Sequence, residues 1–151
     1  MIILILSLVF VLIDQVSKIV ALKYLGKYHS VSVIDGFFDL TLAKNTGAAF
    51  SFLEGGRVIF IVVALVVICF LISYIIKNRC MFKIFDKVDI SLILSGSVGN
   101  LIDRVIYGYV VDFLSFNIFG YDYPIFNFAD CFIVVGGLMF LFKMIFGGEV
   151  K

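Results

Sequence analysis

The chain has 151 residues, of which 63% are hydrophobic and 15% charged, and its formal net charge is +1. A soluble fold of this size has too little interior to hide that much apolar surface, so lipid must solvate much of it. The small net charge also argues against a nucleic-acid partner, which requires a clustered basic face.

The first predicted element is a membrane-spanning helix over residues 1–22. This segment lacks the basic start and the small-residue cleavage site of a removable signal peptide, and its apolar pattern continues past Asp14. Asp14 and Lys18 stand four residues apart, so a helix brings them together on one face. We expect an intrahelical ion pair with a structural role.

Residues 28–55 are predicted to form a small antiparallel sheet outside the hydrocarbon layer. Apolar and polar residues alternate over 31–33 and again over 38–42, with an Asp-Gly turn between the two runs. Small residues follow, where a backbone can approach a ligand closely. Asn45 is as consistent with a turn residue before Gly47 as with a binding residue.

Two further spans are predicted over residues 58–76 and 88–110. The first carries no charge and is long enough to cross a bilayer core of about 30 Å. The second contains Asn100, Asp103 and Arg104, which share one helical face because of their spacing. Such a face lies toward a bundle interior. It either joins two helices or lines a site, where the Arg104 guanidinium suits a carbonyl or a phosphate-like group.

Two carboxylates stand out in the last part of the chain. Asp112 lies near the outer end of the third span, and Asp130 lies about one turn into the fourth, predicted over 125–142. An ionisable group at membrane depth costs about 2.5–3.5 kcal/mol on insertion scales, so it indicates function. Arg104 is the one basic residue at comparable depth, and it has Asp103 beside it. Too few basic side chains therefore remain to neutralise both Asp112 and Asp130 by ion pairing. Two acids that meet can share a proton and act as base and acid, the chemistry of an aspartic peptidase.

The distribution of basic residues predicts the orientation. The connection 77–87 carries Lys77, Arg79, Lys83 and Lys87 against one acid, whereas 107–124 carries no Lys or Arg. We therefore expect 77–87 and both termini in the cytoplasm, with the site near the outer face. The predicted fold is a mainly α membrane protein. It has four transmembrane helices in a single domain, 1–151, and a small antiparallel β-sheet on the outer membrane surface.

Two other functions are compatible with these features. Intramembrane acids also serve as relays in small proton- or ion-coupled carriers, although the two halves of the chain show no convincing repeat of the kind that carriers have. A non-catalytic bundle subunit is the third hypothesis. No His or Cys pattern predicts a metal site, and we expect the three cysteines to be small buried apolar residues.

Five short motifs follow one another along the chain. They are DQVSK at 14–18, NTGAAFS at 45–51, GNLIDR at 99–104, VVDF at 110–113 and FNFAD at 126–130. In this order they resemble the DQxSK, NxGAAFS, GNxxDR, VVDF and FNxAD blocks of the bacterial lipoprotein signal peptidases (signal peptidase II). One departure is SGSV at 95–98, where the family often has more Gly and Ala. It concerns the close approach of the third helix and leaves the acids unaffected.

The resemblance implies an intramembrane aspartyl peptidase with Asp112 and Asp130 as its catalytic pair. It implies that further residues line or support the substrate pocket: Asp14, Lys18, Asn45, Gly47, Asn100, Asp103, Arg104 and Asn127. The implied substrate is a prolipoprotein with a diacylglyceryl group on its lipobox cysteine, cut on the N-terminal side of that cysteine, in the bacterial cytoplasmic membrane. The implied site needs no second chain, so we expect a monomer surrounded by membrane lipid, without cofactor, metal or nucleic acid.

Overall fold

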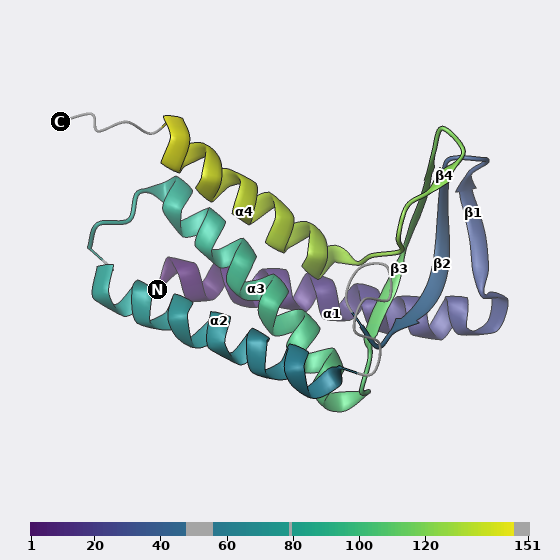
Figure 1. Cartoon of the computed structure of the whole chain (residues 1–151), viewed down its shortest axis with the longest axis horizontal. Helices are drawn as coiled ribbons and strands as arrows, with labels where there is room; N and C mark the ends of the chain where they lie inside the picture. Colours follow the sequence, from purple (N-terminus) through teal and green to yellow (C-terminus); the bar gives the residue numbers. More distant parts are fainter. Residues whose placement is uncertain (48–55, 79, 147–151) are drawn as a thin grey trace.

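The computed structural model describes residues 1–47, 56–78 and 80–146. Its elements, in chain order, are α1 (Ile2–Tyr28), β1 (Ser30–Ile34), β2 (Phe38–Asn45), α2 (Arg57–Asn78), α3 (Ile84–Ile106), β3 (Val110–Ile118), β4 (Tyr121–Asp122) and α4 (Phe128–Phe146). The helices form an elongated bundle, and the sheet stands at one end of it with its strands across the helix axes (Figure 1). The N-terminus and the end of α4 lie at the opposite end of the bundle.

α3 is the central helix, because α1, α2 and α4 all pack against it. Small residues allow this close packing, since a Cβ atom on Gly96 would collide with the carbonyl oxygen of Ala129. The buried residues of α1 recur at intervals of three, four or seven from Ile3 to Leu25, so they form one stripe that faces the bundle. α2 buries only Leu71 among its described residues, and most of its surface faces outward.

Three of the helices, α1, α2 and α4, are long and apolar enough to cross a membrane. The sequence predicted four spans, and the described residues therefore support one fewer by length and hydropathy. α3, the helix that corresponds to the third predicted span, is less apolar because it carries five charged residues: Asp86, Lys87, Asp89, Asp103 and Arg104. It buries twelve of its residues, most of them against the neighbouring helices.

Two helix ends differ from the prediction. α1 continues beyond 22 to Tyr28, because Leu25 in its last turns packs against the sheet. α3 ends at Ile106 and not at 110, because Gly108 adopts a φ of 84°, a left-handed conformation that terminates helices. The chain then enters β3. Asp112, which was expected near the end of a helical span, consequently lies on a strand.

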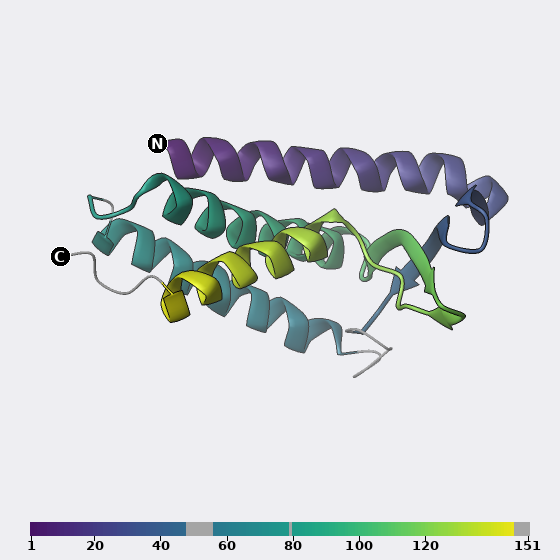
Figure 2. The same ribbon diagram turned by 90° about the horizontal axis from the view of Figure 1, so that it is seen from above.

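The sheet has the order β1-β2-β3-β4, and all neighbouring strands are antiparallel. The predicted pairing of 31–33 with 38–42 is confirmed in β1 and β2, where Val31 lies opposite Leu40. β3 and β4 extend this sheet, although the sequence predicts 107–124 only as a connection between two spans. Phe113 and Leu114 of β3 pack with the last turns of α1, which extends from the bundle as far as the sheet (Figure 2).

Candidate active site

Asp112 is held on β3 in an almost fully enclosed position, with only 2% of its surface exposed. Asn45, at the end of β2, donates a hydrogen bond from Nδ2 to Asp112 Oδ2 at 2.9 Å. Asn127 donates from Nδ2 to Asp112 Oδ1 at 2.6 Å. Burial, and after it the negative charge of Asp130, raise the pKa of Asp112 from 3.8 to about 7, although the two amide donors act in the opposite direction. Asp112 therefore exchanges its proton near neutral pH.

Asp130 lies in the first turn of α4 and is linked to Asp112 through Asn127. Asn100 of α3 donates from Nδ2 to Asp130 Oδ1 at 2.7 Å. The backbone N–H of Asn127 donates to Asp130 Oδ2 at 3.2 Å, and the N–H of Asp130 donates back to Asn127 Oδ1 at 3.0 Å. The single residue Asn127 thus binds one carboxylate through its side-chain amide and the other through its backbone.

Backbone pairing explains why these two acids meet. Phe126 forms an isolated antiparallel bridge with Leu114 of β3. Its N–H donates to the Leu114 carbonyl at 3.1 Å, and its own carbonyl accepts the N–H groups of Phe113 and Leu114. The segment that precedes α4 is thereby fixed beside β3. Because Asp112 and Asp130 lie shortly before and shortly after these paired residues, both carboxylates face the same space.

A network of buried charges lies behind the two acids, centred on Lys18. The Lys18 ammonium lies 2.9 Å from an oxygen of Asp14 and 3.0 Å from an oxygen of Asp103, and all three side chains are almost completely buried. Lys18 also donates to Asn100 Oδ1 at 3.0 Å. Since Asn100 in turn donates to Asp130, the network connects α1 to the candidate acid on α4 through a single amide.

Arg104 borders the site from the end of α3. Its guanidinium donates to the carbonyl of Gly47 at 3.3 Å and lies over the ring of Phe60, 5.0 Å from the ring centroid. Arg57, the first residue of α2, donates to the carbonyl of Arg104 at 2.8 Å. Gly47 is itself tied to Asn45 by a 2.9 Å hydrogen bond from its N–H. The first turn of α2 and the end of β2 therefore hold Arg104 between them.

A cavity of about 560 Å³ opens over the two acids. Its polar wall contains both carboxylates together with Asn45, Asn100 and Arg104. Its other walls are apolar and come mainly from α4 and the segment before it, including Val134, Val135, Ile125 and Phe126. An acid pair at one wall of an otherwise apolar cavity suits hydrolysis of a chain that carries apolar groups. Within the described residues, no group of three or more His, Cys, Asp or Glu side chains is arranged to hold a metal ion.

The ten residues named from the sequence are brought together by the structure. Six of them line the cavity: Asn45, Gly47, Asn100, Arg104, Asp112 and Asp130. Four lie behind it and are buried: Asp14, Lys18, Asp103 and Asn127.

One expected pairing is different. The Asp103 carboxylate binds Lys18 and not Arg104, because consecutive helical residues point about 100° apart. Residues 48–51, the last four positions of the NTGAAFS motif, lie outside the described residues, so the structure does not test that part of the motif.

Several contributors were not identified from the sequence. Gln15 donates to the carbonyl of Gly99 at 3.2 Å and to Asp103 Oδ1 at 3.1 Å, and its place inside the DQVSK motif was the available signal. Phe60 had no such signal. In an apolar span, a phenylalanine that lines a site cannot be distinguished by sequence from one that faces lipid.

The expectation for the cysteines was wrong in large part. Cys69 and Cys80 are exposed on the protein surface, and Cys131 is half-buried. Cys131 lines the cavity, next in the chain to Asp130.

Comparison with known proteins gives consistent results over most of the chain. The family model described as signal peptidase (SPase) II matches residues 6–146. A lipoprotein signal peptidase of Staphylococcus aureus (strain MRSA252) is 39% identical over 142 residues, which are 93% of this chain and 86% of that protein. The protein of the same description from strain JH9 is 38% identical over the same length.

Solved structures agree with the sequence relatives. One, described as a bacterial membrane enzyme determined by the in meso method at 2.3 Å resolution, superposes with a TM-score of 0.84 at 34% identity. The alignment covers 99% of this chain and 92% of the other. A second structure of that description, at 1.9 Å resolution, gives the same TM-score at 35% identity and covers 95% of this chain and 92% of the other.

Proposed function

Because the chain belongs to the signal peptidase II family, it is a peptidase that removes signal peptides from prolipoproteins, and we propose that Asp112 and Asp130 are its catalytic acids. The observation that carries this proposal is the double role of Asn127. It binds Asp112 through its side chain and Asp130 through its backbone, at the wall of an apolar cavity. Both carboxylates line this one cavity.

The proposed reaction uses one proton shared between the two acids. Near neutral pH one carboxylate is ionised and the other protonated, because two close negative charges are costly in a low dielectric. The ionised partner takes a proton from a water between them, and the resulting hydroxide attacks the scissile carbonyl. The protonated partner donates a hydrogen bond to the developing oxyanion and later a proton to the leaving amine. The Nδ2 donors of Asn45, Asn100 and Asn127 hold both carboxylates in place.

The shape of the cavity supports a lipid-modified substrate. Val134 and Val135 lie in its wall and are 58% and 48% exposed, so the cavity opens along the apolar surface of α4. A diacylglyceryl chain on the lipobox cysteine can stay in the bilayer on that side while the bond preceding the cysteine reaches the acids. Gly47 and Arg104 border the same cavity and are proposed to contact the substrate backbone.

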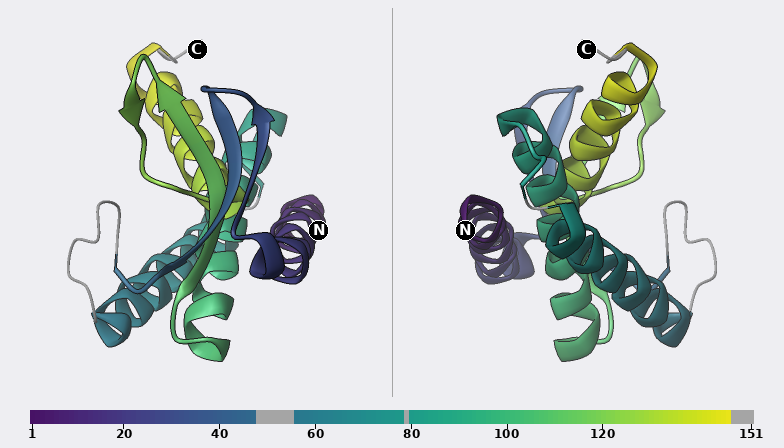
Figure 3. Two further views of the ribbon diagram at one scale, coloured as in Figure 1. Left: turned by 90° about the vertical axis from the view of Figure 1, so that its right-hand side faces the viewer. Right: turned by 90° about the vertical axis from the view of Figure 1, so that its left-hand side faces the viewer.

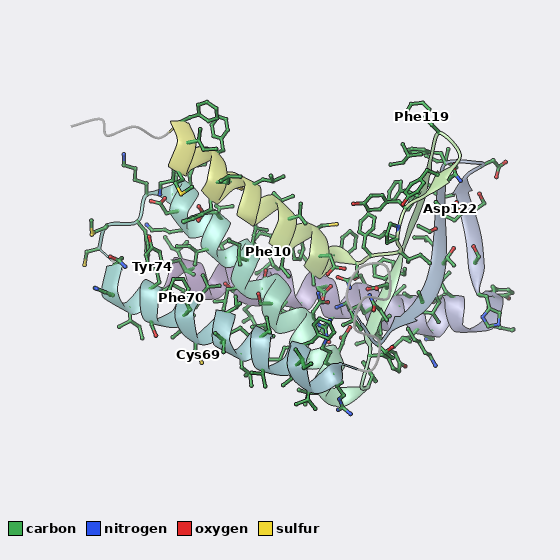
Figure 4. All side chains as sticks on the ribbon, viewed as in Figure 1. Phe10, Cys69, Phe70, Tyr74, Phe119 and Asp122 are labelled. Atoms are coloured by element: carbon green, nitrogen blue, oxygen red, sulfur yellow. The ribbon has the colours of Figure 1, made fainter. Side chains whose placement is uncertain are left out.

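The membrane arrangement belongs to the same proposal. α3 is taken as a span in addition to the three apolar helices that enclose it, which makes four in all. The basic connection 77–87 and both termini lie in the cytoplasm, and the sheet rests on the outer surface of the bacterial inner membrane. The β3–β4 tip supports this location, since Phe119 at that tip is fully exposed, as an aromatic ring at a membrane interface would be (Figure 4). One chain supplies every site residue, which is consistent with a monomer.

The test is cleavage of a synthetic lipobox peptide by the protein purified in detergent. The peptide is prepared with and without diacylglyceryl on its cysteine, and products are identified by mass spectrometry. Asp112→Asn and Asp130→Asn should each reduce turnover at least about 100-fold, because each removes one proton-transfer group. Asp122→Asn is the matched control, since Asp122 is exposed on the outer hairpin and binds Asn117. Substantial turnover by Asp112→Asn or by Asp130→Asn contradicts the proposed catalytic pair. Equal cleavage of the lipidated and the unlipidated peptide contradicts the lipid requirement.

A further inference from the structure

A second cavity lies at the end of the bundle opposite to the sheet. It has a volume of about 510 Å³, and its walls come from the first turn of α1 and the last turns of α2, with Leu4 and Ile72 among them. Phe82 and Lys87 border it from the connection between α2 and α3 and from the start of α3. Lys87 is the one charged side chain among its lining residues in the described part of the chain, and Met1, which carries the N-terminal amino group, is in the same lining.

The cavity exists because α1 and α2 both pack against α3 but scarcely against each other. The beginning of α1, the end of α2 and the beginning of α3 lie at the same end of the bundle (Figure 2). Seen end-on, α1 and α2 occupy different sides of the bundle (Figure 3). A gap with aliphatic walls between two membrane helices is the shape that an acyl chain fills.

Lys87 faces this gap without an acid beside it. Ser91, one helical turn further along α3, donates to the carbonyl of Ile3, so this face of α3 is turned toward α1. The nearest acid in the chain, Asp86, is engaged elsewhere, since it pairs with Lys143 of α4 and accepts the N–H of Lys83. No described carboxylate forms an ion pair with Lys87. Lys87 is half-buried beside apolar walls and forms no ion pair with a described carboxylate, and such a charge favours an external anion.

We propose that this groove binds an anionic phospholipid, with one acyl chain between α1 and α2 and the phosphate on Lys87. The aliphatic walls of the groove suit the acyl chain of such a lipid, and the Lys87 ammonium suits the phosphate of its headgroup. A zwitterionic phospholipid fits less well, because its own cation compensates the phosphate that Lys87 would neutralise. A free phosphate ion satisfies Lys87 but leaves the apolar walls uncovered.

The absence of tryptophan from the sequence allows a single-reporter experiment. Phe82→Trp replaces one aromatic ring by another at the groove and supplies the only fluorescent indole. The full-length variant is reconstituted in vesicles of phosphatidylcholine with increasing fractions of phosphatidylglycerol, and one of the two lipids carries brominated acyl chains that quench the indole. The ratio of quenching constants measures the local preference for the anionic lipid. We expect a preference of about fivefold, the size of one lysine–anionic lipid interaction.

Two charge variants in this background separate a site from general surface charge. Lys87→Gln should reduce the preference to about one. Lys77→Gln, at the exposed end of α2 and outside the groove lining, should leave it unchanged. Equal losses in the two variants, or no preference in the parent, would overturn the proposal. So would loss of the preference on adding inorganic phosphate at constant ionic strength, since that identifies a free anion as the ligand. If Phe82→Trp does not fold, Leu4→Trp, at a 63% exposed position, serves as reporter for the same comparison.

Discussion

Asp14 accepts a hydrogen bond from the backbone N–H of Ala129 at 2.9 Å, and Ala129 is the residue before Asp130. Asp103 has the equivalent relation to the other acid, because it accepts the N–H of Val111 at 3.0 Å, immediately before Asp112. Both anchoring carboxylates bind the same ammonium, that of Lys18. One buried cation thus holds together the two backbone segments that carry the proposed catalytic pair.

Replacement of Lys18 by Met should destabilise the protein strongly. It leaves the Asp14 and Asp103 carboxylates buried without their counter-ion, a loss of about 3–5 kcal/mol in the free energy of unfolding. Thermal or denaturant unfolding in detergent measures this effect. The triple variant Lys18→Met, Asp14→Asn, Asp103→Asn removes the unpaired charges and should recover much of the stability. If the single variant is as stable as the parent, Lys18 does not neutralise these acids.

Asn127→Ala should reduce activity by about 100-fold while the protein remains folded. The substitution removes the 2.6 Å hydrogen bond to Asp112, the 3.2 Å hydrogen bond to Asn100 and the acceptor of the Asp130 N–H. The Asp112 carboxylate is then no longer held by Asn127. A displacement of about 1 Å in a reacting group is sufficient for a loss of this size. Single-turnover cleavage of the lipobox peptide measures it. Asn117→Ala, on the exposed hairpin, is the control that should retain full activity.

The pH profile of cleavage should follow Asp112. Its pKa is raised to about 7 by burial and by the charge of Asp130, so it holds a proton below pH 7 and loses it above. Since the mechanism needs one protonated acid, kcat/KM should fall as the pH rises above about 7. The same shift affects stability, which should decrease as the pH rises from about 3.8 to about 7, because the native state binds this proton more tightly than the unfolded chain.

Asn45→Ala should move this decline to higher pH. Asn45 donates to Asp112 Oδ2 and thereby favours the ionised form, so its removal raises the pKa of Asp112 further. The position of the decline on the pH axis is the measurement, because a general loss of folding lowers the whole curve without moving it. An unchanged position, or a shift to lower pH, would contradict the role given to Asn45.

Two neighbouring glycines of α4 should respond in opposite directions to alanine. A Cβ atom on Gly136 would lie 2.8 Å from the Asp89 carbonyl oxygen and 3.0 Å from Leu92 Cβ, so Gly136→Ala should force α3 and α4 apart and cost about 1–3 kcal/mol. A Cβ atom on Gly137 meets nothing within 4 Å. Gly137→Ala should therefore be neutral or stabilise the helix by up to about 1 kcal/mol. Unfolding midpoints of the two variants provide the comparison.

The sequence was most informative where a local pattern decides the structure. Alternation over 31–33 and 38–42 predicted the β1–β2 hairpin, and the spacing of Asn100, Asp103 and Arg104 predicted a polar face on α3. β3 escaped prediction because its first residues, from Val110 to Leu114, are all buried and show no alternation. A strand enclosed on both faces gives a continuous apolar run, which cannot be told from a helix by periodicity.

Contacts between distant segments were beyond the sequence pattern. The pairing of Lys18 with Asp14 follows from their spacing, but the pairing with Asp103 depends on how α1 and α3 pack. The same holds for Asn127, whose importance rests on Phe126 being fixed beside β3. The family motifs identify these residues but do not predict the hydrogen bonds and ion pairs between them. Those contacts are known only from the fold.

The 27 residues of α1 make a rod of about 40 Å, longer than the roughly 30 Å hydrocarbon core that it crosses. Asp14 and Lys18, which hold the segments of the two proposed catalytic acids, lie about 18–24 Å from the start of this rod. The depth of the acids is consequently set by a continuous helix and not by loops. A substrate segment that runs beside α1 as a helix reaches the acids after roughly 12–16 residues. This helix therefore acts as a fixed spacer between the far end of the bundle and the proposed acids.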